Sequence, residues 1–79
     1  MYIDIATDFL IDREDIVGIF DLDNTTINSH TRNFLNESQK KNKVVYLVKD
    51  IPKSFVLTSD GTVYIVELSS QILRKRLEI

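Results

Sequence analysis

Residues 55–66 read FVLTSDGTVYIV, two apolar runs on either side of the pair Asp60-Gly61. Glycine adopts a positive φ without steric penalty and Asp tolerates one, so this pair is typical of a two-residue β-hairpin turn. Such a turn fixes the strand register, and we expect Thr58 to lie opposite Val63. The stretch therefore predicts two antiparallel strands, at residues 54–58 and 62–66.

Side-chain alternation gives this hairpin two faces, and both are apolar. In the expected register one face carries Phe55, Leu57, Tyr64 and Val66, and the other carries Val56, Thr58, Val63 and Ile65. Because an antiparallel hairpin usually leaves one face to water, we expect a helix over one face and a second subunit over the other. We predict Val56, Val63 and Ile65 as interface residues of a homo-oligomer.

The chain before the hairpin predicts strands and one helix. Residues 1–22 are rich in β-branched and aromatic residues, which favours strands with a tight turn at residues 6–8. Ser29 is a suitable N-cap for a helix that runs to about residue 41, and a further strand is expected at residues 43–48.

The chain after the hairpin predicts a C-terminal helix that begins at Ser69 or Ser70 and ends at Leu77. The whole of residues 1–79 is then a single α+β domain. We expect a small antiparallel sheet, with three strands, a helix, three strands and a helix in chain order.

Size and composition limit how this domain can be stabilised. A chain of 79 residues buries only about 60% of its unfolded surface. It has no Cys and a single His, so neither a disulfide, a structural metal nor a cofactor is expected. Oligomerisation is the remaining support.

No signal peptide or membrane-length apolar run is present in the sequence, which predicts a cytoplasmic protein without membrane contact.

Charge is divided unevenly along the chain. Residues 1–30 hold seven carboxylates and one Arg, a net of −6, whereas residues 31–79 hold nine cations and five carboxylates, a net of +4. We expect the acidic segment of one subunit to meet the basic segment of the next. Such a heterologous contact closes into a ring when its rotation permits.

Residues 16–25, IVGIFDLDNT, resemble the nucleophile motif of the haloacid-dehalogenase phosphatases, in which Asp21 would attack phosphate and Asp23 would transfer protons. That chemistry needs a parallel sheet, paired acids for Mg²⁺ and about 150 residues. Here Thr58 belongs to an antiparallel hairpin and the later acid, Glu67, stands alone. We therefore interpret the motif as a strand end and turn at residues 21–26, and predict no enzyme activity and no small-molecule substrate.

A different resemblance spans the chain from Met1 to about Arg76. Residues 1–3, 16–26, 31–35, 52–55 and 69–76 resemble, in order and spacing, the RemB-like branch of the Rem-type extracellular matrix (biofilm) regulators of Gram-positive bacteria. The resemblance implies a cytoplasmic, non-enzymatic protein. It also implies rings and DNA binding upstream of biofilm-matrix genes, which are properties of the RemA-type relatives.

The residues that would contact DNA are less evident. RemA-type relatives carry Arg where this chain has Asp15 and, in the turn before the strand at residues 54–58, Asp50-Ile51. In that turn only Lys53 keeps a positive charge. The other candidates form two clusters: Lys40, Lys41 and Lys43, and Arg74, Lys75 and Arg76. Each cluster also has an interpretation without DNA. The first would be cations that stabilise the C-terminal end of a helix, and the second would be an ordinary solvated helix face. Three functions stay open, in this order: a DNA-binding oligomeric regulator, an oligomeric protein-interaction module, and a shortened phosphatase.

Overall fold

The computed structural model describes residues 1–22 and 29–78. The elements are β1 (Tyr2–Ala6), β2 (Phe9–Asp12), the 3-10 turn η1 (Arg13–Asp15), β3 (Ile16–Asp21), α1 (Ser29–Lys40), β4 (Val44–Leu47), β5 (Ser54–Thr58), β6 (Val63–Val66) and α2 (Ser70–Leu77). The α+β class, the order of elements and the C-terminal helix are confirmed. The turn expected at residues 23–26 lies outside the described residues.

The strands form two sheets, and the larger sheet is mixed. β1 and β2 make an antiparallel ribbon whose tight turn contains Asp8 at φ 57°, as expected for residues 6–8. The second sheet has the order β3-β5-β6-β4, in which β4 runs parallel to β6. The prediction of a purely antiparallel sheet is wrong, because β4 is followed by two reversals of the chain and β6 therefore returns in the direction of β4.

The predicted register of the β5–β6 hairpin is wrong by one residue. Leu57, and not Thr58, lies opposite Val63. The turn is a three-residue loop, closed by the bond from the Thr58 amide to the Thr62 carbonyl at 3.0 Å, with Gly61 at φ +86°. The pattern matches a turn followed by a residue in the left-handed region, the usual three-residue alternative to a two-residue turn.

This one-residue shift changes which side chains share a face. Phe55, Leu57, Val63 and Ile65 lie on one face of the sheet, whereas Val56, Tyr64 and Val66 lie on the other. A shift of one strand by one residue moves all of its side chains to the opposite face. The predicted grouping of Val56 with Val63 and Ile65 is therefore wrong.

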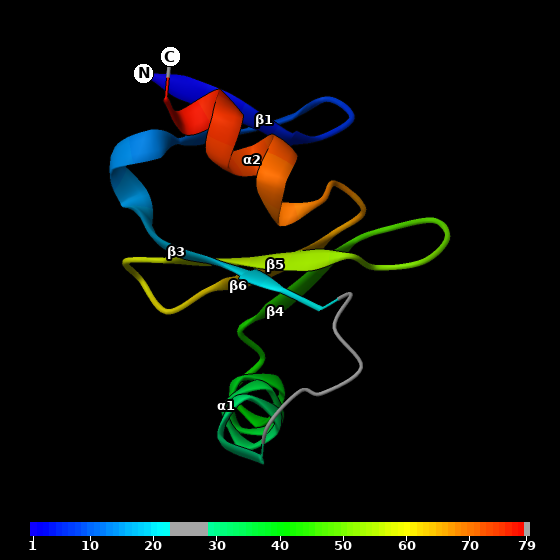
Figure 1. The fold of residues 1–79 in the computed structure, drawn as a ribbon. Helices are drawn as coiled ribbons and strands as arrows, with labels where there is room; N and C mark the ends of the chain where they lie inside the picture. Colours follow the sequence, from blue (N-terminus) through cyan, green and yellow to red (C-terminus); the bar gives the residue numbers. More distant parts are fainter. Residues whose placement is uncertain (23–28, 79) are drawn as a thin grey trace.

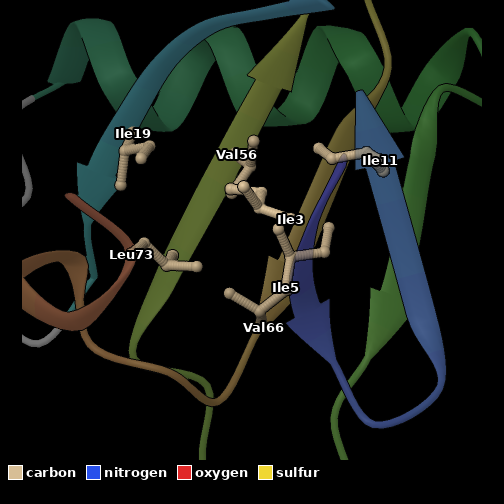
Figure 2. Packing of buried hydrophobic residues seen from close by; sticks show 7 residues of the cluster. All are labelled: Ile3, Ile5, Ile11, Ile19, Val56, Val66 and Leu73. Atoms are coloured by element: carbon tan, nitrogen blue, oxygen red, sulfur yellow. The ribbon is translucent and has the colours of Figure 1, made fainter. Parts of the chain in front are cut away.

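Elements of the chain itself lie over both faces of the larger sheet, and Phe20 and Tyr46 stay 44% and 57% exposed on the face that α1 partly covers. The β1–β2 ribbon and α2 lie on one side and α1 on the other (Figure 1). The main core is an aliphatic cluster between the sheet, the ribbon and α2: Ile3, Ile5, Ile11, Ile19, Val56, Val66 and Leu73 (Figure 2). The second core, around Phe55, includes the half-buried Leu35 of α1. The described residues thus form three layers.

Candidate nucleic-acid interface

The cations of α2 are largely engaged in holding that helix in place. Arg74 donates from Nη2 to the Ile19 carbonyl of β3 at 3.1 Å, and Arg76 donates from Nη1 to the Asp4 carbonyl of β1 at 2.8 Å. Only Lys75 of this predicted cluster is exposed with no side-chain hydrogen bond or ion pair to the described residues. The sequence did not predict these two anchoring bonds, because their partners lie 55 and 72 residues away.

The cluster of Lys40, Lys41 and Lys43 lies on the surface where α1 ends, and all three residues are exposed. Asn42, at φ 58°, turns the chain out of the helix, and the Lys43 amide then bonds to the Ser38 carbonyl at 2.9 Å. The lysine ammonium groups are weakly held. Lys40 lies 3.5 Å from Glu37 in an exposed ion pair, and Lys43 donates to the Asp60 carbonyl at 3.3 Å.

Lys53 lies at the opposite end of the sheet from Lys43. The Lys53 amide bonds to the carbonyl of Val66, the last residue of β6, whereas the Lys43 carbonyl accepts from Val63, the first residue of that strand. Lys43 and Lys53 are therefore separated by the length of β6, and a strand of four residues is about 10 Å long or more. The predicted DNA-contacting residues thus occupy three separate places on one chain.

The positions at which the RemA-type resemblance implies Arg are exposed and not basic. Asp15 is exposed, and its backbone carbonyl accepts from the Ser59 amide at 2.8 Å. Asp50 lies in a loop that Glu67 holds, since one carboxylate oxygen of Glu67 accepts from the amides of Lys49 at 2.9 Å and Asp50 at 2.7 Å. Ile51 follows with 67% of its surface exposed.

The predicted oligomer-interface residues lie inside the chain. Val56 and Val63 are fully buried and Ile65 is 6% exposed. They belong to the two different cores, so they do not form one docking face. The exposed apolar side chains are elsewhere. Tyr2 and Leu10 are 65% and 58% exposed on the outer face of the ribbon, beside a groove of about 390 Å³ that also borders Asp12, Asp15 and Asp60.

The outward direction of Tyr2 was predictable from the alternation in residues 2–5, in which Ile3 and Ile5 are buried. Asp4 lies opposite Leu10 in the ribbon, which places these two residues and Tyr2 on one face. This surface was not predicted, because the two apolar faces of the hairpin at residues 55–66 gave the stronger signal for exposed apolar area in the sequence.

The phosphatase-like motif does not lie in the sheet that its chemistry needs. β3, which ends at Asp21, pairs antiparallel with β5, and the Thr58 hydroxyl bonds to the Asp60 carboxylate at 2.7 Å. Asp23 lies outside the described residues. Within residues 1–22 and 29–78, no group of three His, Cys, Asp or Glu side chains is arranged to hold a metal ion.

Neither helix in this part of the chain is long and apolar enough to span a membrane.

Comparison with known proteins decides the family. The sequence profile of the RemA-like family, described as Extracellular matrix regulatory protein A-like, matches residues 2–77. The chain belongs to the RemA-like family. This RemA-like chain is also 40% identical to Extracellular matrix regulatory protein B of Bacillus subtilis (strain 168) over 78 residues, which cover 99% of the chain and 91% of that protein. The resemblance stated from the sequence is confirmed.

Proposed function

We propose that this RemA-like protein is a non-enzymatic, cytoplasmic regulator of extracellular matrix (biofilm) genes that binds DNA as a homo-oligomer. The observation that carries the proposal is the family match over residues 2–77, together with 40% identity to a protein named as a matrix regulator. A match over nearly the whole chain supports a shared role for the whole domain, unlike the ten-residue phosphatase-like motif.

The exposed lysines give the DNA-binding part of this proposal its chemistry. Affinity for duplex DNA comes largely from cations that contact phosphates, and each contact releases counterions. Lys40, Lys41 and Lys43 leave their ammonium groups accessible to such contacts. Three contacts predict that the logarithm of the binding constant falls with the logarithm of salt concentration with a slope of about −2.7 for each engaged subunit.

Oligomerisation multiplies a weak basic surface. One chain carries a net charge of −2 and offers few phosphate contacts. Several subunits must therefore contact the same DNA for the complex to persist at physiological salt. The exposed Tyr2 and Leu10 provide apolar area for contact between subunits, and the acidic groove beside them favours a basic neighbouring surface. These features support a heterologous contact, which closes into a ring if its rotation permits.

One experiment tests both parts of this function. The unmodified protein is titrated against fluorescent duplex DNA of mixed sequence at several salt concentrations, and the same sample is measured by multi-angle light scattering. We expect an oligomer whose DNA affinity falls steeply with salt. A folded monomer at micromolar concentration would contradict the oligomer, and the absence of binding at low salt would contradict the DNA-binding role.

A protein-interaction module without DNA contact is the second candidate, and the anchoring of Arg74 and Arg76 to backbone carbonyls favours it. These two bonds reduce the number of cations that are free to contact phosphates. An oligomer that binds no duplex DNA at low salt would select this candidate.

A further inference from the structure

The helix α1 presents an unusually polar surface. Its sequence is SHTRNFLNESQK, of which only Thr31, Leu35 and Ser38 are half-buried or buried. Side chains spaced four, three and four residues apart share one face of a helix. The outermost stripe is therefore Ser29, Asn33, Asn36 and Lys40, and all four residues are exposed. This stripe has no apolar side chain with which to dock on a protein core.

Charge separates the layer that contains α1 from the layer on the other side of the sheet. Residues 29–43 carry four cations and one carboxylate, a net of +3. In the opposite layer, residues 1–15 carry five carboxylates and one Arg, and residues 70–78 carry three cations and one carboxylate, a combined net of −2. The β1–β2 ribbon and α1 lie on opposite sides of the four-stranded sheet (Figure 1). The α1 side is therefore the side of the subunit that attracts a polyanion.

The chemistry of this surface fits duplex DNA. Lysine contacts phosphates without regard to sequence, and Asn, Ser and Lys side chains donate to backbone and base edges in the major groove, which is about 12 Å wide and admits one helix. Phe34 is the one exposed large apolar residue of α1, and it lies about 100° around the helix from Asn33. The outward stripe is thus free for polar contacts.

We propose that the outward face of α1, continued by Lys41 and Lys43, is the DNA-contacting surface of this protein. The inference rests on the proposed function and selects one of the three places at which cations occur. Arg74 and Arg76 hold α2 against β3 and β1, and Lys53 lies at the far end of the sheet. Only the end of α1 groups three exposed lysines within four residues.

The six lysines of the chain allow a matched test. One variant replaces Lys40, Lys41 and Lys43 with Gln, and the control replaces Lys49, Lys53 and Lys75 with Gln, so both lose the same net charge. We expect only the α1 variant to lose salt-dependent affinity. Between about 50 and 200 mM salt, the DNA affinity of the unmodified protein and of the control should fall roughly 40-fold more than that of this variant for each engaged subunit. Replacement of Lys40, Lys41 and Lys43 by Arg should restore binding.

The outcomes separate this inference from the proposed function. No DNA binding by the unmodified protein would overturn both. Binding that is lost equally in the two Gln variants, or only in the control, would overturn the α1 surface and leave the function standing. Circular dichroism and urea unfolding report the folding of each variant. Lys41 is exposed, and its side chain makes no hydrogen bond or ion pair with the described residues, so the single substitution Lys41→Gln should reduce the salt slope by about 0.9 for each engaged subunit.

Discussion

At the scale of single residues, Asp60 decides the register of the central hairpin. Its Oδ1 accepts from the Thr58 hydroxyl at 2.7 Å and from the Thr62 amide at 3.0 Å, and these bonds stabilise a three-residue loop. The position of the turn was predictable from Asp60-Gly61. Its length was not, because the same dipeptide occurs in two-residue and three-residue turns and the side chain of Asp60 selects between them.

The same bonds make this turn sensitive to acid. The hydrogen bond from the Thr58 side chain, followed by that from the Thr62 backbone, lowers the pKa of Asp60 from 3.8 to about 2. Because the pKa is lower in the folded chain, the carboxylate stabilises the fold above about pH 4, and this contribution is lost as the pH falls toward about 2. Asp60→Asn keeps an acceptor oxygen but carries no charge.

We therefore expect the stability difference between the unmodified protein and Asp60→Asn to be constant above about pH 4 and to shrink toward pH 2. Urea unfolding midpoints measured across this range give the difference directly. Two pH profiles that stay parallel down to the acid limit would show that the carboxylate does not stabilise the turn.

At the scale of elements, helices and strands were predictable where local chemistry fixes them. Ser69 caps α2 as the sequence allowed, accepting from the Ile72 amide at 3.2 Å, and α1 ends one residue before the predicted boundary. The parallel pairing of β4 with β6 was not predictable. It depends on contacts between segments far apart in the chain, and the local signals of residues 43–48 are the same for either direction.

The attachment of α2 to the sheet gives a prediction with an adjacent control. Leu73 is fully buried in the main core, whereas its neighbour Ile72 is 44% exposed. Leu73→Ala should lower the free energy of unfolding by about 2–5 kcal/mol, because it leaves a cavity between α2 and the sheet. Ile72→Ala should cost about 1 kcal/mol or less. Equal losses in urea unfolding would contradict the position of α2 in the core.

At the scale of the whole molecule, charge is arranged by layer and not by the two halves of the sequence. Along the sequence, Arg74 and Arg76 belong to the same basic segment, residues 31–79, as the lysines at residues 40–43. In the structure, α2 packs on the same side as the acidic ribbon, and Arg76 bonds to β1 (Figure 1). The basic side of the subunit is then α1 alone, and the acidic groove beside Tyr2 lies with the ribbon.

The candidate site was only partly predictable from the sequence for the same reason. The exposed lysines at the end of α1 could be identified from the sequence, because a short polar segment stays at the surface in almost any fold. The engagement of the α2 arginines, and the separation of Lys53 from Lys43 by the length of β6, required the three-dimensional arrangement.

Lysine footprinting of the unmodified protein tests the central claim most directly. Acetylation of each of the six lysines is followed by mass spectrometry with and without duplex DNA at low salt. DNA should slow the acetylation of Lys40, Lys41 and Lys43 and leave Lys49, Lys53 and Lys75 unchanged. Protection confined to Lys53 or Lys75 would contradict a DNA surface formed by α1. So would acetylation rates that DNA leaves unchanged at all six lysines.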